Sequence, residues 1–111
     1  MSEPDPTRFP NAPADWTPED ALRVASKEAL KLTDEHWDAV RALQEYYARH
    51  ADVPMLNKRD LHDALDEKFH AKGGLRHLYE IFPGGPIAQG CRLAGLKPPE
   101  GAIDKAFGSV S

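Results

Sequence analysis

Residues 78–101 read LYEIFPGGPIAQGCRLAGLKPPEG, and this stretch decides most of the fold. Its PGGP run at 83–86 predicts a tight turn, because glycine and proline favour conformations that other residues resist. A helix over 86–93 follows, since Pro86 suits the first position of a helix and Gly95 lies just beyond its end. Pro98 and Pro99 then exclude further helix, because proline has no amide hydrogen to donate. The stretch therefore predicts a turn, a helix and an extended arm.

Four more helices are predicted upstream, where Thr17, Thr33 and Asn57 can each cap a helix start. Their expected bounds are 18 to about 30, 34 to about 50, 58–72 and 75–82. The sequence thus predicts an all-α fold, a small orthogonal bundle of about five helices. Apolar residues at helical spacing predict its core: Trp37, Val40, Leu43, Tyr47, Leu61, Leu65, Phe69, Leu78, Phe82 and Ile87.

Three regions differ in composition. Residues 1–14 are rich in proline and predict a loose N-terminal arm, with a short β-hairpin around 8–11 as the alternative. Residues 15–95 form the helical domain. Residues 96–111 form a C-terminal arm with an extension, because Pro98 and Pro99 separate them from the last helix.

Composition favours one soluble globular domain, since 41% of the 111 residues are hydrophobic and 29% are charged. No apolar run is long enough to span a membrane. The chain begins without the basic residues and apolar run of a signal peptide, so we expect a cytoplasmic protein. Five acidic residues and one arginine within residues 1–20 account for the net charge of −4. The remaining, neutral body does not favour nucleic acid binding.

Cys91 is the only cysteine, so the chain cannot form an internal disulfide. A reactive thiol needs a helix start or nearby cations to lower its pKa. Cys91 lies well inside the predicted last helix, and Arg92 is its only cationic neighbour in the sequence. The residues alone therefore predict an inert, buried thiol.

His62, Asp66 and His70 repeat at four-residue spacing on one predicted helix, a pattern that can hold a metal. Two helical turns separate the two histidines by about 12 Å, too far for both to reach one ion. Only the His62 and Asp66 pair could share one. We interpret the three as a solvated polar face, and we predict no metal and no cofactor.

Two helices joined by a glycine-rich link, within residues 56–82, also suggest a DNA-binding helix-turn-helix. The second of them offers only Arg76 and His77 as polar residues to contact bases. Residues 58–77 contain five cations and four anions, which is not the basic surface that DNA requires. Ordinary helical packing is the preferred interpretation.

Residues 78–101 closely resemble the signature of the DsrC/TusE/DsvC family of sulfur-relay proteins. Residues 32–37, the pair Tyr46 and Tyr47, and Trp16 also resemble that family's pattern. The resemblance implies a helical bundle with a mobile C-terminal arm, whose penultimate cysteine carries sulfur as a persulfide. It further implies a protein partner of sulfur metabolism, which would be sulfite reductase-like, heterodisulfide reductase-like or another sulfur-relay protein. Some family members have an upstream cysteine at the position of Cys91.

The chain departs from the family pattern at the residue that matters most. Ala102, eleven residues after Cys91, stands where the resemblance implies the sulfur-carrying cysteine. Ala88 replaces a lysine that is usual there, and residues 104–111 extend beyond the usual end. We therefore expect a non-catalytic, partner-binding or regulatory member. The alternatives are a sulfur carrier that uses Cys91 alone, which would make the chain a sulfurtransferase-type enzyme, and a DNA-binding regulator.

The arm is the expected partner-binding element, and apolar contacts must hold it because no disulfide to Cys91 can form. Phe107 is the expected anchor, and docking of the arm against the bundle should shield Cys91. The residues assigned to this element are Leu96, Pro98, Pro99, Gly101, Ala102, Ile103 and Phe107.

Overall fold

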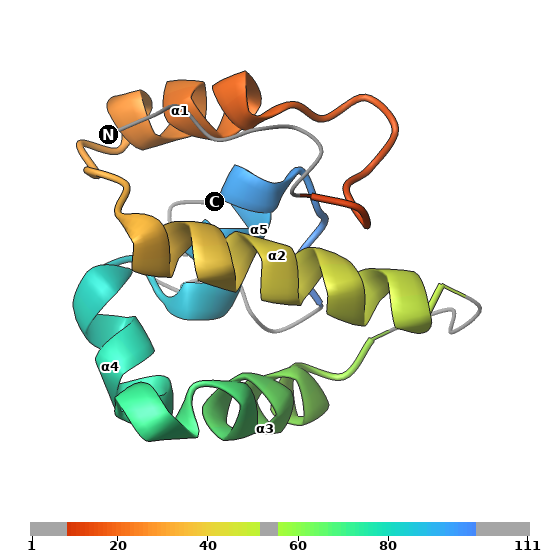
Figure 1. The fold of residues 1–111 in the computed structure, drawn as a ribbon, viewed down its shortest axis with the longest axis vertical. Coiled ribbons are helices and arrows are strands. Elements are labelled where there is room, and N and C mark those ends of the chain that lie inside the picture. Colours follow the sequence, from red (N-terminus) through yellow and green to blue (C-terminus); the bar gives the residue numbers. More distant parts are fainter. Residues whose placement is uncertain (1–8, 52–55, 100–111) are drawn as a thin grey trace, which may run out of the picture.

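The structure is a computed structural model that describes residues 9–51 and 56–99. Five α-helices and one short 3-10 helix make up these residues, and no strand occurs among them (Figure 1). The predicted all-α fold is confirmed, and residues 9–11 form no hairpin strand. The elements are α1 (Pro18–Lys27), α2 (Asp34–Arg49), α3 (Lys58–Lys68), η2 (His70–Lys72), α4 (Gly74–Ile81) and α5 (Pro86–Ala94).

The helix starts lie where the sequence predicts them. Thr17 forms a capping box with Asp20, and Thr33 forms another with His36. The Asn57 side chain accepts hydrogen bonds from two backbone amides of α3. The end of α1 was predicted about three residues too late. Ala29 takes a positive φ of 56°, and the Leu30 amide bonds back to the Ala25 carbonyl, which closes the helix early.

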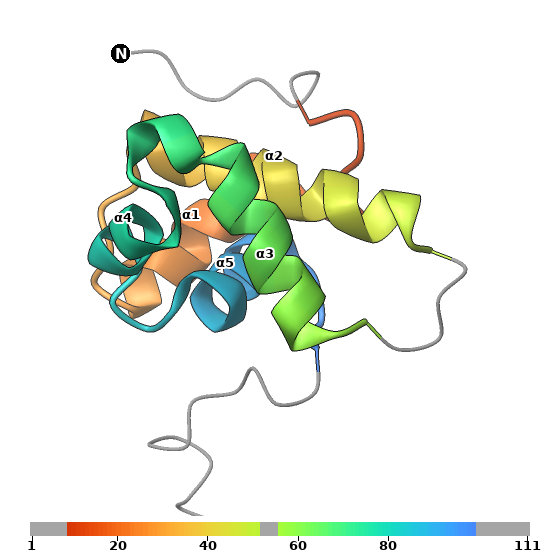
Figure 2. The same cartoon turned by 90° about the horizontal axis from the view of Figure 1, so that it is seen from below.

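Helix α5 lies at the centre of the fold and packs against α1, α2, α3 and α4 (Figure 2). Every residue of α5 except Arg92 is buried, as expected for a helix enclosed by others. Gly90 allows α2 to approach closely, because an added Cβ would lie 2.7 Å from the Leu43 Cδ1 atom. The stretch that predicts the fold thus supplies its central helix.

All the predicted core residues except Tyr47 are buried. Tyr47 is half-buried because its hydroxyl reaches a backbone carbonyl near the surface. The prediction missed Phe9, which lies in the segment expected to be loose. Its side chain is only 4% exposed and packs edge-on against Trp16 and Trp37, with ring centres 5.1 and 5.7 Å away. Residues 1–8 lie outside the described residues.

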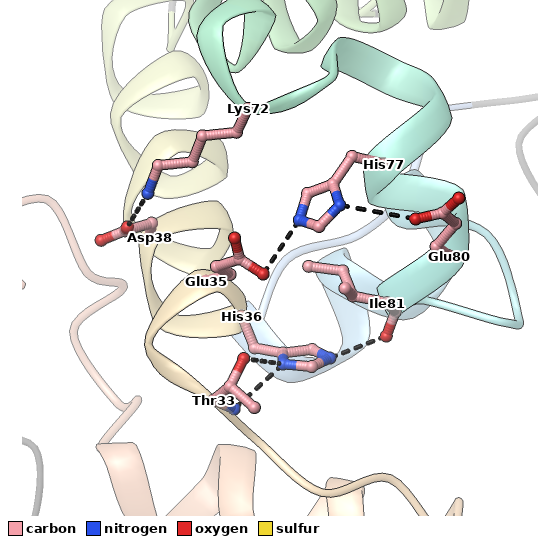
Figure 3. Close-up of polar contacts among 8 residues, drawn as sticks. All are labelled: Thr33, Glu35, His36, Asp38, Lys72, His77, Glu80 and Ile81. Carbon is pink, nitrogen blue, oxygen red and sulfur yellow. Dashed lines mark hydrogen bonds and ion pairs between the residues drawn. The ribbon is translucent and has the colours of Figure 1, made fainter.

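Polar contacts join the start of α2 to α4 (Figure 3). The Nδ1 atom of buried His36 accepts the Thr33 amide hydrogen at 3.0 Å, so its proton must lie on Nε2, which donates to the Ile81 carbonyl at 2.7 Å. His77 lies between Glu35, at 2.9 Å, and Glu80, at 3.6 Å. These contacts hold the His77 side chain within the fold, whereas a DNA-binding function would need it free to contact bases.

The three residues weighed as metal ligands lie in separate surroundings. Asp66 accepts the Leu75 amide hydrogen at 2.7 Å and so caps α4, whose own start at Gly73 and Gly74 has no side chain to do so. His62 lies 3.2 Å from the Tyr79 hydroxyl, and His70 belongs to η2. Within the described ranges, no three His, Cys, Asp or Glu side chains are placed to hold a metal. None of the helices there is long and apolar enough to cross a membrane.

Candidate functional site

The Cys91 thiol lies inside the bundle, in the second turn of α5, and none of its surface is exposed. Burial raises the pKa of the thiol to about 11, because the thiolate would lose its hydration. The Tyr47 hydroxyl and the Arg92 charge oppose this effect but do not overcome it. At neutral pH only about one thiol in ten thousand would be ionised at such a pKa. Cys91 is buried as the sequence predicts, and its inertness stays a prediction.

Tyr47 of α2 connects this thiol to the start of the C-terminal arm. Its hydroxyl donates a hydrogen bond of 2.6 Å to the Lys97 carbonyl, and the same oxygen lies 3.6 Å from the Cys91 sulfur. Burial and the nearby thiol both raise the pKa of Tyr47, so the hydroxyl stays protonated and remains a donor.

Side chains from distant parts of the chain fix the end of α5. Trp16 donates its indole hydrogen to the Leu93 carbonyl at 2.7 Å, and Gln44 donates to the Ala94 carbonyl at 3.0 Å. The Leu96 amide closes the helix on the Cys91 carbonyl at 2.8 Å, while Gly95 adopts the left-handed conformation with φ 76°. The direction in which residues 96–99, which we name the arm base, leave the bundle is therefore defined.

Glu28 ties α1 to α5 on another side of the site. Its carboxylate accepts two hydrogen bonds from Arg92, at 2.7 and 3.0 Å, and one from Gln89 at 2.7 Å. The Gln89 side-chain oxygen Oε1 in turn accepts the Gly84 amide hydrogen at 3.1 Å, which holds the turn before α5. Hydrogen bonding to Arg92 lowers the pKa of Glu28 despite partial burial.

A Glu28→Gln variant should lose about 1 kcal/mol of unfolding free energy at pH 7, because the pair with Arg92 is only partly shielded from water. A carboxylate with a lowered pKa stabilises the fold above its unfolded pKa, near 4.5, and that stabilisation disappears as the pH falls through the lower folded value. Urea unfolding between pH 7 and pH 3 should show the two proteins converging in acid. Glu67→Gln, on the exposed surface of α3, is the control. A loss that persisted unchanged at pH 3 would contradict this account.

The structure places only part of the predicted arm. Leu96 and Pro98 are half-buried and Pro99 is buried. Gly101, Ala102, Ile103 and Phe107 lie outside the described residues. The sequence did not identify Tyr47 as a contact of the arm base, or Gln44 and Trp16 as contacts of the end of α5. In the sequence, Tyr47 and Gln44 were visible only as an aromatic and an amide residue on the predicted core side of one helix. Trp16 was visible only as a tryptophan just before another helix.

Comparisons with known proteins agree with the resemblance of the signature stretch. The family described as "DsrC like protein" matches residues 2–103. Sulfurtransferase TusE of Photorhabdus laumondii is 37% identical over 87 residues, which are 78% of this chain and 77% of that protein. Sulfurtransferase TusE of Escherichia coli K12 is 34% identical over 98 residues, covering 87% of this chain and 88% of that protein.

A solved structure is similar in fold as well as in sequence. The NMR structure of Allochromatium vinosum DsrC is 41% identical and superposes with a TM-score of 0.65. The match covers 78% of this chain and 77% of that one. The family match over residues 2–103 includes the whole helical body and the site around Cys91.

Proposed function

The chain belongs to the DsrC-like protein family, and from that membership we propose that it binds a protein partner of sulfur metabolism without itself carrying sulfur. Its relatives are named sulfurtransferases, so sulfur relay is the setting in which a partner is expected. The family resemblance aligns Ala102 with the sulfur-carrying cysteine of the arm. A methyl group has no lone pair to attack a persulfide and cannot hold sulfur.

The burial of Cys91 is the observation that carries the proposal. A carrier thiol must meet a bulky protein persulfide as a thiolate, and this thiol has no exposed surface and a pKa raised to about 11. The only cysteine of the chain is therefore a buried residue of the core. What remains for the family scaffold is recognition of a partner.

The arm supplies the recognition element in this proposal. Pro98 and Pro99 restrict the backbone to an extended form, so the arm loses little conformational entropy when it binds. Pro99 is buried, and the half-buried Leu96 packs against the core and so holds the arm base on the bundle. Gly101, Ala102, Ile103 and Phe107 would then contact the partner, which by family resemblance is sulfite reductase-like, heterodisulfide reductase-like or another relay protein.

The rival function is a sulfur carrier that uses Cys91. In that reaction the Cys91 thiolate attacks the outer sulfur of a donor persulfide, and the donor thiolate leaves with the electron pair of the broken bond. The chain would gain one sulfur atom and the donor would lose it. Such a reaction requires the thiol to become exposed and ionised.

Intact mass after incubation with a persulfide donor separates these functions. We expect the natural chain to gain no sulfur, and we expect an Ala102→Cys variant to gain about 32 Da, the mass of one sulfur atom, which a reductant removes. The variant adds a thiol at the position that the family resemblance assigns to the carrier cysteine.

The control is the double variant Cys91→Ser with Ala102→Cys, which should still gain sulfur on the arm. The rival would be supported if the natural chain gained the same mass and Cys91→Ser abolished the gain. Failure of Ala102→Cys to gain sulfur would contradict the assignment of residue 102 to the carrier position.

A further inference from the structure

One hydroxyl group contacts both the arm base and the only thiol of the chain. The Tyr47 oxygen is 2.6 Å from the Lys97 carbonyl oxygen and 3.6 Å from the Cys91 sulfur. Tyr47 comes from α2, Cys91 from the central helix α5 and Lys97 from the segment after it. No other hydroxyl within the described residues is hydrogen-bonded to Cys91.

The proton positions follow from the chemistry of the three groups. A carbonyl can only accept, so the single hydroxyl proton of Tyr47 goes to Lys97. The thiol must then act as the donor toward the Tyr47 oxygen. The hydrogen-bonded order is therefore thiol to hydroxyl to arm carbonyl, and displacing the arm base removes the acceptor that fixes the hydroxyl.

Hydrogen bonds hold the end of α5 in place, so any movement of the arm must begin just beyond it, near this contact. Trp16, Gln44 and the Leu96 amide hold the carbonyls of the last helical turn. Lys97 is the first residue beyond those bonds, and its carbonyl bonds to the side chain of Tyr47. An arm that lifts from the bundle would therefore pivot at residues 96–97, beside the thiol.

We propose that the Tyr47 hydroxyl is a positioning group that holds the arm base over Cys91, so that arm movement and access to the thiol are coupled. A partner that draws the arm away would expose Cys91, and modification of Cys91 would prevent the arm base from returning. The coupling goes beyond the proposed function and does not depend on whether Cys91 ever carries sulfur.

Tyr47→Phe tests this directly in the full chain, because it removes one oxygen and keeps the ring. Loss of one hydrogen bond should raise the population with a displaced arm base by roughly two- to tenfold. Iodoacetamide labelling of native Cys91, followed by intact mass, should accelerate by the same factor. Amide exchange at Leu96, whose hydrogen bonds to Cys91, should accelerate with it.

Tyr46→Phe is the matched control. Tyr46 is the preceding residue, its ring stacks on His50 at 4.1 Å, and its hydroxyl forms no hydrogen bond among residues 9–51 and 56–99. This variant should label at the rate of the natural chain. Amide exchange in α3 and α4 should stay unchanged in both variants, since a general loss of stability would accelerate exchange there too.

Three results would overturn the proposal. If Tyr47 instead turned its proton toward the sulfur and acted only on the charge of the thiol, its removal would slow labelling, because a hydrogen bond donated to the sulfur favours the thiolate. If Tyr47→Phe labelled faster only in proportion to faster exchange throughout the helices, Tyr47 would be an ordinary contributor to stability. Labelling at an unchanged rate would likewise show that the arm base does not cover Cys91.

Discussion

Trp37→Ala should lower the free energy of unfolding by about 3–5 kcal/mol, because it removes a large aromatic side chain from the core and leaves a cavity. Trp37 is 7% exposed, and the Phe9 ring packs edge-on against it with centres 5.7 Å apart. The loss is a large share of the 5–15 kcal/mol that stabilises a typical domain. Urea unfolding followed by far-ultraviolet circular dichroism measures it without relying on tryptophan fluorescence.

Tyr79→Ala provides the matched comparison. Tyr79 is also aromatic and helical, but it is 49% exposed, so its removal should change the unfolding free energy by less than about 1 kcal/mol. A Trp37→Ala loss as small as that of Tyr79→Ala would place Trp37 at the surface and contradict the packing of the N-terminal segment on α2.

Gly95→Ala should destabilise the protein by about 2–5 kcal/mol, through two separate effects. Gly95 has a φ of 76°, which an L-residue with a side chain adopts only with strain. An added Cβ would also lie 2.6 Å from the Trp16 Cδ1 atom. The indole cannot easily move away, because it donates the 2.7 Å hydrogen bond to the Leu93 carbonyl.

A double-mutant cycle with Trp16→Ala separates these effects. In the Trp16→Ala background the collision is gone, so Gly95→Ala should destabilise by only the backbone strain of about 1–2 kcal/mol. Urea unfolding of the four proteins gives the coupling energy. If Gly95→Ala had the same effect in both backgrounds, close packing of Trp16 on Gly95 would not be part of the stability.

The helices could be predicted from the sequence because their signals are local. Thr17, Thr33 and Asn57 accept hydrogen bonds from amides within three residues of them, and Gly95 ends α5 through its own backbone freedom. The apolar periodicity of α2 and α3 is also a local pattern, so it predicted which side of each helix is buried. The predicted end of α1 was wrong because nothing in the sequence around Ala29 indicates its left-handed conformation.

Contacts between distant residues could not be predicted in this way. Asp66 appeared to belong to a polar surface pattern, yet it caps α4 from nine residues away. Phe9 lay in a proline-rich segment without periodicity, and only the presence of Trp16 and Trp37 beside it makes its burial favourable. No local pattern distinguishes Phe9 from a surface residue, and none marks the exposed Asp66 as a helix cap.

The sequence by itself determined the all-α class, the position of most helices, the family signature of residues 78–101 and the single thiol. Only the tertiary structure decided that Tyr47, 44 residues before Cys91 and 50 before Lys97, contacts both of them. The reason is physical. Caps and turns depend on neighbours in the chain, whereas the burial and pKa of a thiol depend on which helices enclose it and on which distant hydroxyl reaches it.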